Sequence, residues 1–418
     1  MQIVQSEPSA LVSDARADRC PLEHTVWSQQ KTTRLVEPVA APIKLDAAGT
    51  WHIYGFEEAR AIERSGDTKQ AGFDAEVVEW FSRGRNMPIL YLEGKLHQEQ
   101  RKRTARFFTP KAVSTNYRQV MERLADTLVA GVRRKKRADL SQVSLTLAVQ
   151  VVAEVVGLTN SRLPGMTKRL ETFLEDHWSI DRRGHPLALI RMLWKQRHVA
   201  AFFFLDVQPA IRARRRKPQE DVISHLIAQG YSESEILTEC LTYAVAGMAT
   251  TREFMSLAAW HLLEQPALCA CYRDAPEEER YAILHEILRL EPVVGDLYRL
   301  TTAHLHIESS GAPLVIPQGE RIRIHIHGTN TDESIVEEHP LQLCPGRTLK
   351  GEKVPPMLMS FGDGHHRCPG AYLAIQETDI LLRRLLALDG LRVERVPTMT
   401  WNDLLTGYEL RKFMIVID

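Results

Sequence analysis

Two cysteines of this chain lie in similar tripeptides, and their surroundings indicate which one does chemistry. Cys368 ends the run "FGDGHHRC" and is followed by proline and glycine, whereas Cys344 lies in "PLQLCPGRTLKGEKVPP" with no periodic segment after it. Apolar residues recur at helical spacing after Cys368, and Pro369 suits the first position of a helix. We therefore expect Cys368 to be the N-cap of a helix and Cys344 to lie in a loop.

A cysteine at the start of a helix is suited to bind a metal as thiolate. Unpaired backbone N–H groups and the positive end of the helix dipole favour the charged sulfur. Gly362 and Gly364 let the backbone turn tightly beside a flat group, Phe361 can shield the sulfur from water, and His366 adds positive charge. One sulfur without a second soft ligand suits haem iron better than zinc or an iron–sulfur cluster. A helix-capping cysteine beside a catalytic or surface histidine is the alternative.

The whole segment resembles the haem-binding signature of cytochrome P450 enzymes, F-G-x-G-x-H-x-C-x-G. The matching residues are Phe361, Gly362, Gly364, His366, Cys368 and Gly370, and Leu373, Ala374 and Glu377 match the helix that follows. The resemblance implies haem b with Cys368 as its axial thiolate ligand. It also implies a mainly α fold with small β-sheet regions. In that fold a long central helix crosses the distal haem face and the cysteine loop lies on the proximal face.

Further motifs of the family occur in the expected order. "HEILR" contains Glu286 and Arg289, an E-x-x-R pair that the resemblance makes a buried structural ion pair. The arginine that completes this network in the family aligns with Gln342, with Arg347 nearby. "HQEQRKRTARFFTP" resembles the family's H-x-x-x-R helix. The resemblance implies that the haem propionates are held by His97, Arg101, Arg299 and His366.

The middle of the predicted central helix departs from the family pattern. The family has A-G-x-acid-T there, and Ala246, Gly247 and Thr250 match it, so Ala246 and Gly247 are expected beside the haem. Ala249 occupies the position of the acid. A glycine followed by threonines also predicts local loosening of the helix. Without the acid, protons must reach the distal side through ordered water, the substrate or nearby side chains. The candidates among side chains are Thr250, Thr251 and Glu253.

The resemblance also indicates which segments line the substrate pocket. They are the loop before His97, the central helix, the turn after the E-x-x-R motif and a C-terminal loop, and such pockets are mostly apolar. The predicted lining residues are Met87, Leu90, Tyr243, Met248, Val293, Val294, Leu297, Leu405 and Tyr408.

Helical patterns dominate the elements that must position these residues. "YSESEIL" offers Ser232 and Glu235 as a capping box, and no proline interrupts the chain from there to Pro266. A second helix is expected to begin at Asp274 and stop before Pro292. Strand patterns occur at 51–56, 312–317, 321–328, 391–396 and 413–418. We predict a loosely held segment over 1–25 and one haem domain over 26–418.

Composition excludes several classes of protein. The 418 residues have a formal net charge of zero, which gives no general attraction to nucleic acid or membranes. The basic runs at 133–137 and 212–217 are expected at solvated loops or helix ends. Six irregularly spaced cysteines favour a reducing compartment. The sequence shows no secretory signal and no segment of membrane-spanning length, so we expect a soluble, cytoplasmic protein.

These patterns predict a bacterial-type haem-thiolate monooxygenase of secondary metabolism. It would transfer one oxygen atom from O2 to a small, largely apolar substrate. No flavin or NAD domain is present, so electrons would come from a ferredoxin or flavodoxin-like partner with its NAD(P)H reductase, docking near 101–106 and 133–137. Three alternatives stay open. They are an atypical or peroxide-driven enzyme, suggested by Ala249, a tailoring enzyme acting on substrates tethered to an acyl or peptidyl carrier protein, and a haem-based sensor or ligand carrier.

Overall fold

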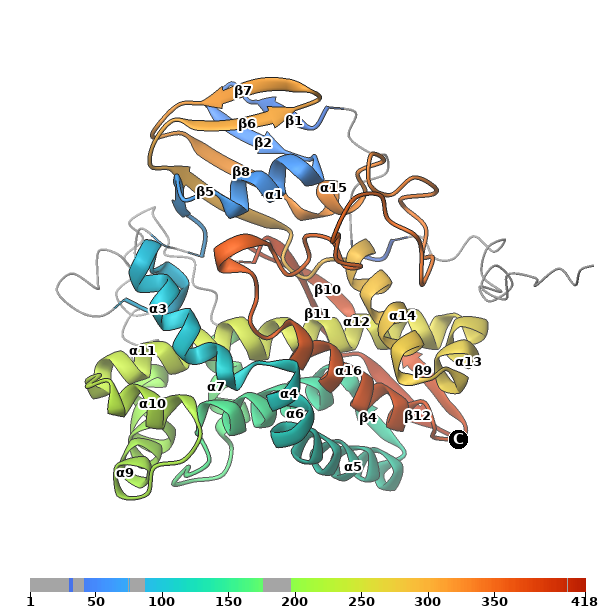
Figure 1. Cartoon of the computed structure of the whole chain (residues 1–418). Helices are drawn as coiled ribbons and strands as arrows, with labels where there is room; N and C mark the ends of the chain where they lie inside the picture. The colour runs from blue at the N-terminus through green and yellow to red at the C-terminus, as the bar shows by residue number, and fades with distance from the viewer. Residues whose placement is uncertain (1–29, 33–40, 74, 76–86, 176–196, 404) are drawn as a thin grey trace, which may run out of the picture.

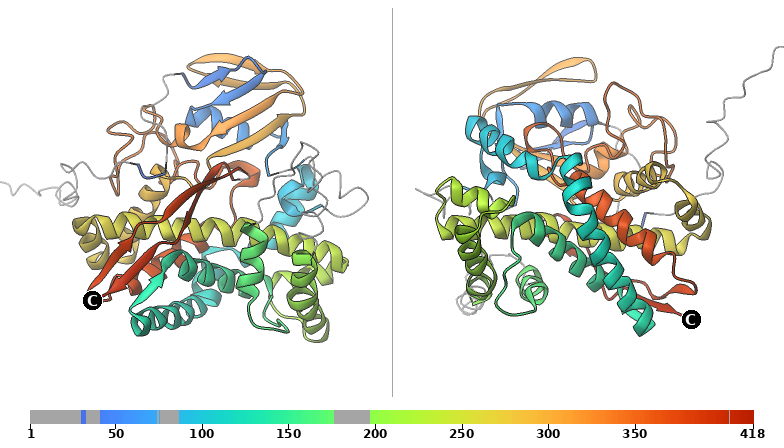
Figure 2. Two further views of the ribbon diagram at one scale, coloured as in Figure 1. Left: turned by 180° about the vertical axis from the view of Figure 1, so that it is seen from behind. Right: turned by 60° about the horizontal axis from the view of Figure 1, so that its bottom comes forward.

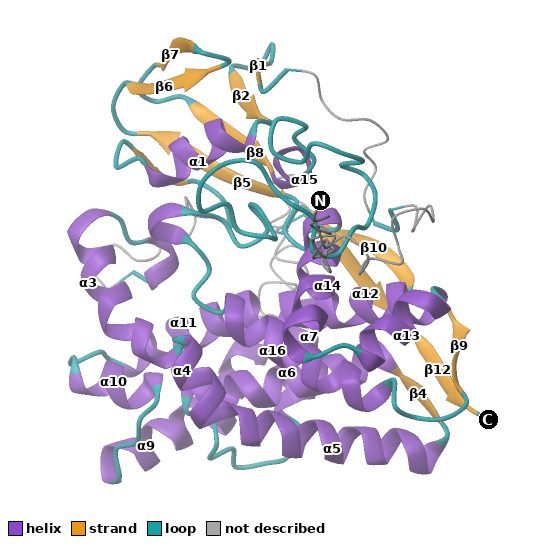
Figure 3. Cartoon of the chain, turned by 45° about the vertical axis from the view of Figure 1, so that its right-hand side comes forward, coloured by secondary structure: helices purple, strands orange, loops and turns teal. Residues whose placement is uncertain are grey.

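The computed structural model describes residues 30–32, 41–73, 75, 87–175, 197–403 and 405–418, so the predicted loose segment 1–25 lies outside the described residues. A β-rich unit lies at one end of the molecule, and a larger helical body packs beneath it (Figure 1). Figure 3 shows the same division, with strands gathered in the upper unit and along one edge of the helical body. No helix in the described ranges combines the length and apolar character needed to cross a membrane.

The upper unit is a five-stranded sheet in the order β1-β2-β8-β5-β3, with a separate hairpin β6–β7. Strands β2 and β8 are parallel, and the other pairs are antiparallel. Phe56 and Ile62 of helix α1 belong to the same buried hydrophobic cluster as Ile322 and Ile324 of β8. The strands are β1 (Ile43–Leu45), β2 (Thr50–Ile53), β3 (Thr68–Gln70), β5 (Asp296–Thr301), β6 (Leu305–Ser309), β7 (Ala312–Ile316) and β8 (Arg321–His325).

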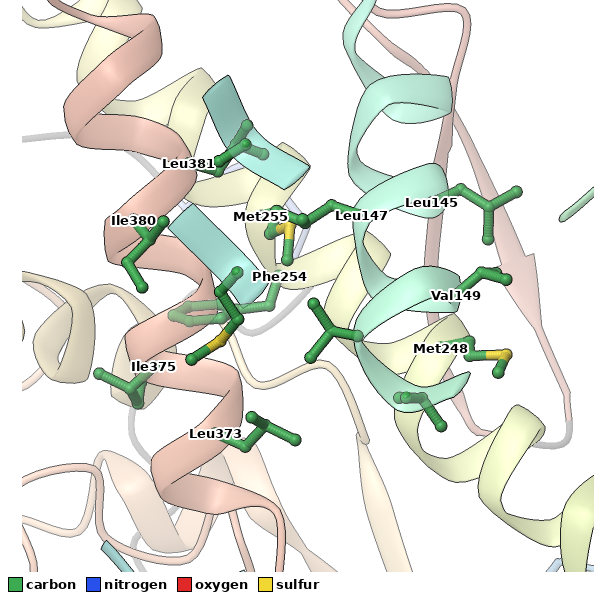
Figure 4. Close-up of a cluster of buried hydrophobic side chains, with 14 of the residues drawn as sticks. Leu145, Leu147, Val149, Met248, Phe254, Met255, Leu373, Ile375, Ile380 and Leu381 are labelled. Atoms are coloured by element: carbon green, nitrogen blue, oxygen red, sulfur yellow. The ribbon is translucent and has the colours of Figure 1, made fainter. Parts of the chain in front are cut away.

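The helical body is built around one long helix. Figure 4 shows Phe254 and Met255 of this helix between Leu147 of α6 and Ile380 of α16, all in one hydrophobic cluster. The helices in the described ranges are α1 (Phe56–Arg64), α3 (Gly94–Thr104), α4 (Pro110–Ala112), α5 (Arg118–Lys135), α6 (Leu140–Val156), α7 (Met166–Glu175), α9 (Gln208–Arg216), α10 (Val222–Ala228), α11 (Glu233–Tyr243), α12 (Thr250–Glu264), α13 (Pro266–Asp274), α14 (Glu277–Leu290), α15 (Ile326–Asn330) and α16 (Ala371–Leu385). Short 3-10 or π segments are η2 (Ile89–Tyr91), η3 (Ala105–Phe107), η4 (Val113–Tyr117), η5 (Phe203–Val207), η6 (Ala244–Ala249) and η7 (Gly364–His366).

The long helix consists of α11, the π-helical η6 and α12, which follow one another without a break. Ser232 and Glu235 form the predicted capping box at its start. The predicted loosening is confirmed by η6, and the hydroxyl of Thr250 donates to the carbonyl oxygen of Ala246 at 2.6 Å. A π segment of this kind often lies at a functional site.

Two small sheets complete the chain near its C-terminus. One contains β4 (Arg137–Asp139), β12 (Met414–Ile417) and β9 (Leu391–Arg395), and the other is the hairpin of β10 (Thr398–Asn402) and β11 (Gly407–Arg411). Figure 2 shows these strands running along one side of the helical body. They brace α12, because β9 and β11 both pack on it.

Two predicted boundaries were wrong by three residues. Helix α14 begins at Glu277 with Pro276 as its N-cap, because Asp274 is the last residue of α13. Strand β8 ends at His325, where the backbone enters α15. The basic runs do lie at the ends of α5 and α9, but Arg214 is buried and pairs with Asp221, so it is not solvated.

Candidate active site

The loop that carries Cys368 is closed by backbone geometry. The N–H of Cys368 donates to the carbonyl oxygen of Phe361 at 2.8 Å. Gly362 and Gly364 have φ of 65° and 61°, in the left-handed region that favours glycine. A Cβ on Gly364 would lie 2.1 Å from the carbonyl oxygen of Glu63, so this position admits no side chain. The glycines of the motif are therefore required by the loop itself.

An aspartate fastens this loop to the β-rich unit. Asp363 accepts the N–H of Gly364 at 2.6 Å, and its carboxylate pairs with Arg64 of α1 at 2.9 Å and with Arg60 at 3.5 Å. The cysteine is thus positioned from both sides, by α1 before it and by α16 after it.

The predicted N-cap position of Cys368 was wrong. Helix α16 begins at Ala371, and its N-cap is Gly370, because Pro369 and Gly370 form a turn before the first helical residue. The sulfur nevertheless receives the backbone N–H groups of Gly370 and Ala371. The helix terminus therefore faces the sulfur as expected, from two residues further along the chain.

The free thiol of Cys368 is held above its ordinary pKa. Desolvation raises the pKa and outweighs the two N–H groups and the charges of Arg101 and Arg367, which lower it. A coordinated cation deprotonates a thiol outright, so a bound metal ion would make this sulfur a thiolate. Among the described residues no group of three or more His, Cys, Asp and Glu side chains could hold a metal ion. The donor set therefore fits an iron that brings its own equatorial ligands, as haem does.

The four predicted propionate ligands gather beside this loop. The rings of His97 and His366 stack with centroids 4.1 Å apart, and Arg101 donates to the carbonyl oxygen of Arg367. Burial, followed by the charge of His366, lowers the pKa of His97 to about 3. His97 is therefore a neutral hydrogen-bonding group at physiological pH. The cluster fits a haem edge with two carboxylates, and the roles of its members stay predictions.

Two glutamates that the sequence did not reveal lie within this cluster, Glu63 buried and Glu93 partly exposed. Glu63 binds Arg299 through both carboxylate oxygens, at 2.8 and 2.6 Å. Glu93 pairs with His366 at 3.1 Å. Burial lowers the pKa of Arg299, but the charge and hydrogen bonds of Glu63 outweigh it and hold that pKa above its ordinary value. A haem propionate would have to share Arg299 with Glu63.

The E-x-x-R pair forms the buried ion pair that was expected. Glu286 contacts Arg289 at 2.7 Å and Arg347 at 2.9 Å, and it also accepts the N–H of Cys344. Burial raises the pKa of Glu286, but the two arginines outweigh it and lower the net value. Arg347 is therefore the third member of the network, while Gln342 contributes only its backbone oxygen, to both arginines.

One face of the long helix is open near η6. Ala246 is exposed and Tyr243 and Thr250 are partly exposed, whereas Met248 and Ala249 are buried. Gly247 does not share this face, because a Cβ there would lie 3.1 Å from the side chain of Val152 on α6. Its small size therefore serves the packing of the long helix on α6, and its place beside the haem stays a prediction.

The predicted relay role of Glu253 is also wrong. Its carboxylate is 1% exposed and is bound by Arg252 at 2.9 Å, by Arg411 at 2.7 Å and by the N–H of Leu410 at 2.7 Å. Glu253 therefore fastens α12 to β11. Thr251 is buried as well, which leaves Thr250 as the relay candidate on the open face.

The predicted pocket residues fall into two groups. Met248 and Tyr408 belong to the hydrophobic core, where Met248 lies next to Val149 (Figure 4) and the Tyr408 hydroxyl donates to the carbonyl oxygen of Glu291 at 3.4 Å. These two assignments were wrong. The turn after E-x-x-R and the C-terminal loop do pack together, since the N–H of Gly295 donates to Leu405. The residues that keep partial exposure are Met87, Leu90, Tyr243, Val294 and Leu297, whereas Val293 and Leu405 are buried.

Comparison with known proteins decides the family. The family model for cytochrome P450 matches residues 281–394, which include the E-x-x-R helix and the whole cysteine loop. The chain belongs to the cytochrome P450 family. It is therefore a monooxygenase whose cofactor is haem b with a cysteine thiolate ligand.

Relatives of this P450 enzyme span its length. The biotin biosynthesis cytochrome P450 of Bacillus subtilis is 25% identical over 389 residues, covering 90% of both chains. Erythromycin C-12 hydroxylase of Saccharopolyspora erythraea is 26% identical over 372 residues, covering 85% of this chain and 86% of its own. The crystal structure of P450BioI in complex with acyl carrier protein ligated to hexadec-9Z-enoic acid superposes with a TM-score of 0.72 at 23% identity. It covers 90% of this chain and 95% of its own.

Proposed function

We propose that this P450 enzyme inserts one oxygen atom from O2 into a small, largely apolar organic substrate, using electrons from a separate ferredoxin-type protein. The observation that carries the proposal is the sulfur of Cys368, held by backbone N–H groups at the start of α16 in a loop that admits no side chain at Gly364. Bound haem supplies the activation and cleavage of dioxygen. A single haem domain over 26–418 and a cytoplasmic location are parts of the same proposal.

The chain's own residues would hold the cofactor through one strong ligand and several polar contacts. Cys368 would bind the haem iron, and Arg101, Arg299, His97 and His366 would contact the propionates. Because His97 is neutral, it donates a hydrogen bond and adds no charge. Phe361 covers the cysteine loop on its inner side, where it packs against the hydrophobic core.

Thr250 is the residue that we assign to proton delivery. Its hydroxyl hydrogen is donated to the carbonyl oxygen of Ala246, so its oxygen lone pairs are free to accept a hydrogen bond from water. This arrangement lets Thr250 hold an ordered water on the open face of the helix. Ala249 is buried and carries no acid, so no side chain at that position links Thr250 to solvent.

A carrier-tethered substrate is the second candidate, and two observations favour it. The related P450BioI was crystallised with an acyl-laden carrier protein. Helix α9 ends in Arg214, Arg215 and Arg216, of which Arg214 is internally paired and Arg215 is shared with Glu233 at 2.7 Å. Arg216 and Lys217 remain exposed at this end and would suit an acidic partner.

Reconstitution tests the proposal directly. The purified haem protein would be combined with a surrogate ferredoxin, its reductase and NADPH, and titrated with candidate substrates while the Soret band is followed. A saturable shift to shorter wavelength together with oxygen-dependent NADPH use and an oxygenated product supports the proposed function. Turnover with hydrogen peroxide alone favours the peroxide-driven alternative. Haem binding without turnover under either condition favours a sensor or carrier.

A further inference from the structure

A buried carboxylate on α11 has only one of its two oxygens satisfied. Glu239 is 5% exposed, and its Oε1 accepts the N–H of Ile89 in η2 at 3.1 Å. Its Oε2 is fully buried and has no hydrogen-bond partner in the described part of the chain. A buried carboxylate in this condition is costly to the fold, because desolvation favours its neutral form.

Glu239 lies between two walls of the proposed substrate pocket. Helix α11 carries it one turn before Tyr243, which is partly exposed on the face that continues to Ala246 and Thr250. On the other side η2 provides Ile89 and the pocket candidate Leu90. The carboxylate thus joins the loop before α3 to the central helix at the far end of the open face.

Other buried glutamates of this chain have the partners that Glu239 lacks. Glu63 and Glu286 contact arginines, and Glu291 contacts His261 at 3.0 Å. No cation contacts Glu239 within the described ranges, and burial raises its pKa to about 7. Glu377 is buried without a charged partner as well, but α16 packs it among α5, α12 and α14 and away from η2.

The geometry points to a ligand group that completes this site, and we infer that Glu239 binds an ammonium group of the substrate. A cation with N–H donors satisfies both the charge and the open lone pairs of Oε2. Thr250 lies eleven positions after Glu239, so at 1.5 Å per residue the two are roughly 16 Å apart. The substrate class is therefore an elongated amine whose apolar part reaches Thr250. This inference rests on the proposed function, because it places the oxidised carbon near Thr250.

Two probes of equal length test the inference by binding alone. Dodecylamine and dodecanol have the same apolar chain and differ in the charged end. We expect dodecylamine to bind the haem protein roughly tenfold to a hundredfold more tightly at pH 8, by calorimetry, and to move the Soret band to shorter wavelength. Below pH 7 its binding should release protons, because Glu239 must ionise to pair with the ammonium.

A conservative variant isolates the carboxylate. Glu239→Gln keeps an oxygen for the N–H of Ile89 but removes the charge, so the preference for the amine should vanish while the affinity for dodecanol stays the same. Glu99→Gln, an exposed glutamate on the neighbouring α3, is the control and should retain the preference. An equal preference in wild type and Glu239→Gln overturns the inference. A shift of the Soret band to longer wavelength with the amine also overturns it, because the nitrogen is then on the iron.

Failure of this inference can be told from failure of the proposed function. If dodecanol shifts the Soret band to shorter wavelength and is oxygenated but the amine shows no advantage, the ammonium site is wrong and the monooxygenase proposal stands. If neither probe shifts the band and no substrate supports oxygen-dependent turnover, both are wrong.

Discussion

The cysteine loop and the middle of the long helix are the two halves of the site, and they are built on different rules. In the loop, backbone hydrogen bonds and left-handed glycines determine the residue types, so that Gly364 admits no alternative. Along the helix, Tyr243, Ala246 and Thr250 share an open face on which the backbone accepts many side chains. The comparison teaches that the residues that identify the family lie where the backbone conformation restricts the residue type. The reaction and the substrate depend on the open face of the long helix, where the residue type is less restricted.

The largest effect on activity is expected from a substitution in the cysteine loop. Cys368→Ser should abolish monooxygenation and remove the long-wavelength band of the reduced carbon monoxide complex, because an alcohol cannot replace the thiolate. Optical spectra of the reduced protein with carbon monoxide measure this. Cys344→Ser, in the second copy of the tripeptide, is the matched control and should leave the band unchanged. Retention of the band in Cys368→Ser would show that another residue is the ligand.

The next largest effect is a loss of stability on breaking the ion network of Glu286, which lies on the same side as the cysteine loop. Glu286→Gln leaves Arg289 buried without a counter-ion, and removing one member of a buried pair costs about 3–5 kcal/mol of stability. Denaturant unfolding monitored by haem absorbance measures the loss. Gln342→Ala is the control, because only the backbone oxygen of Gln342 takes part. Equal stability of the two variants would contradict the network.

Glu239 on the long helix is expected to make the stability of the protein depend on pH. The pKa of Glu239 is raised from 4.5 to about 7 in the folded protein, so the folded state binds more protons than the unfolded state between these values. Stability should therefore fall by about 3 kcal/mol as pH rises from 4.5 through 7, and it should fall less in Glu239→Gln. Unfolding curves of both proteins over this range measure the difference. Parallel pH profiles would show that Glu239 is not desolvated.

The smallest effect concerns the division of electrons between product and peroxide. Thr250→Ala should lower the yield of product per NADPH several-fold and raise hydrogen peroxide release, because the ordered water loses its anchor. Thr250→Ser should restore the yield. Thr242→Ala, which removes the same kind of bond to the carbonyl oxygen two turns earlier, is the control and should leave the yield unchanged. A normal yield in Thr250→Ala would remove Thr250 from proton delivery.

The sequence predicted best those features that depend on local residue spacing. The capping box at Ser232, the helix after Cys368, the long helix and the E-x-x-R pair all rest on contacts within a few residues. The start of α16 was placed two residues too early, because the turn at Pro369 and Gly370 follows the cysteine before the helix begins. A proline fits that turn as well as the first helical position, so its type alone does not separate the two.

Features that depend on distant contacts were missed or misassigned. Glu63 and Arg299 are 236 positions apart, and nothing near Glu63 in the sequence signals a partner. Glu253 was taken for a relay acid, because its partner Arg411 lies on a strand at the other end of the chain. Met248 was placed in the pocket although it lies about 200° around the helix from Ala246, on the side that packs in the hydrophobic core.

The π segment has a consequence for how the two halves of the long helix are aligned. A π turn holds one more residue than an α turn, so it sets the rotation of α12 about the helix axis relative to α11. If 244–249 formed a regular α-helix with every residue kept, the extra residue would rotate one half by roughly 100° against the other. Thr250 would then leave the open face although every side chain on α12 is unchanged. The π turn therefore determines which side chains of α12 face the site.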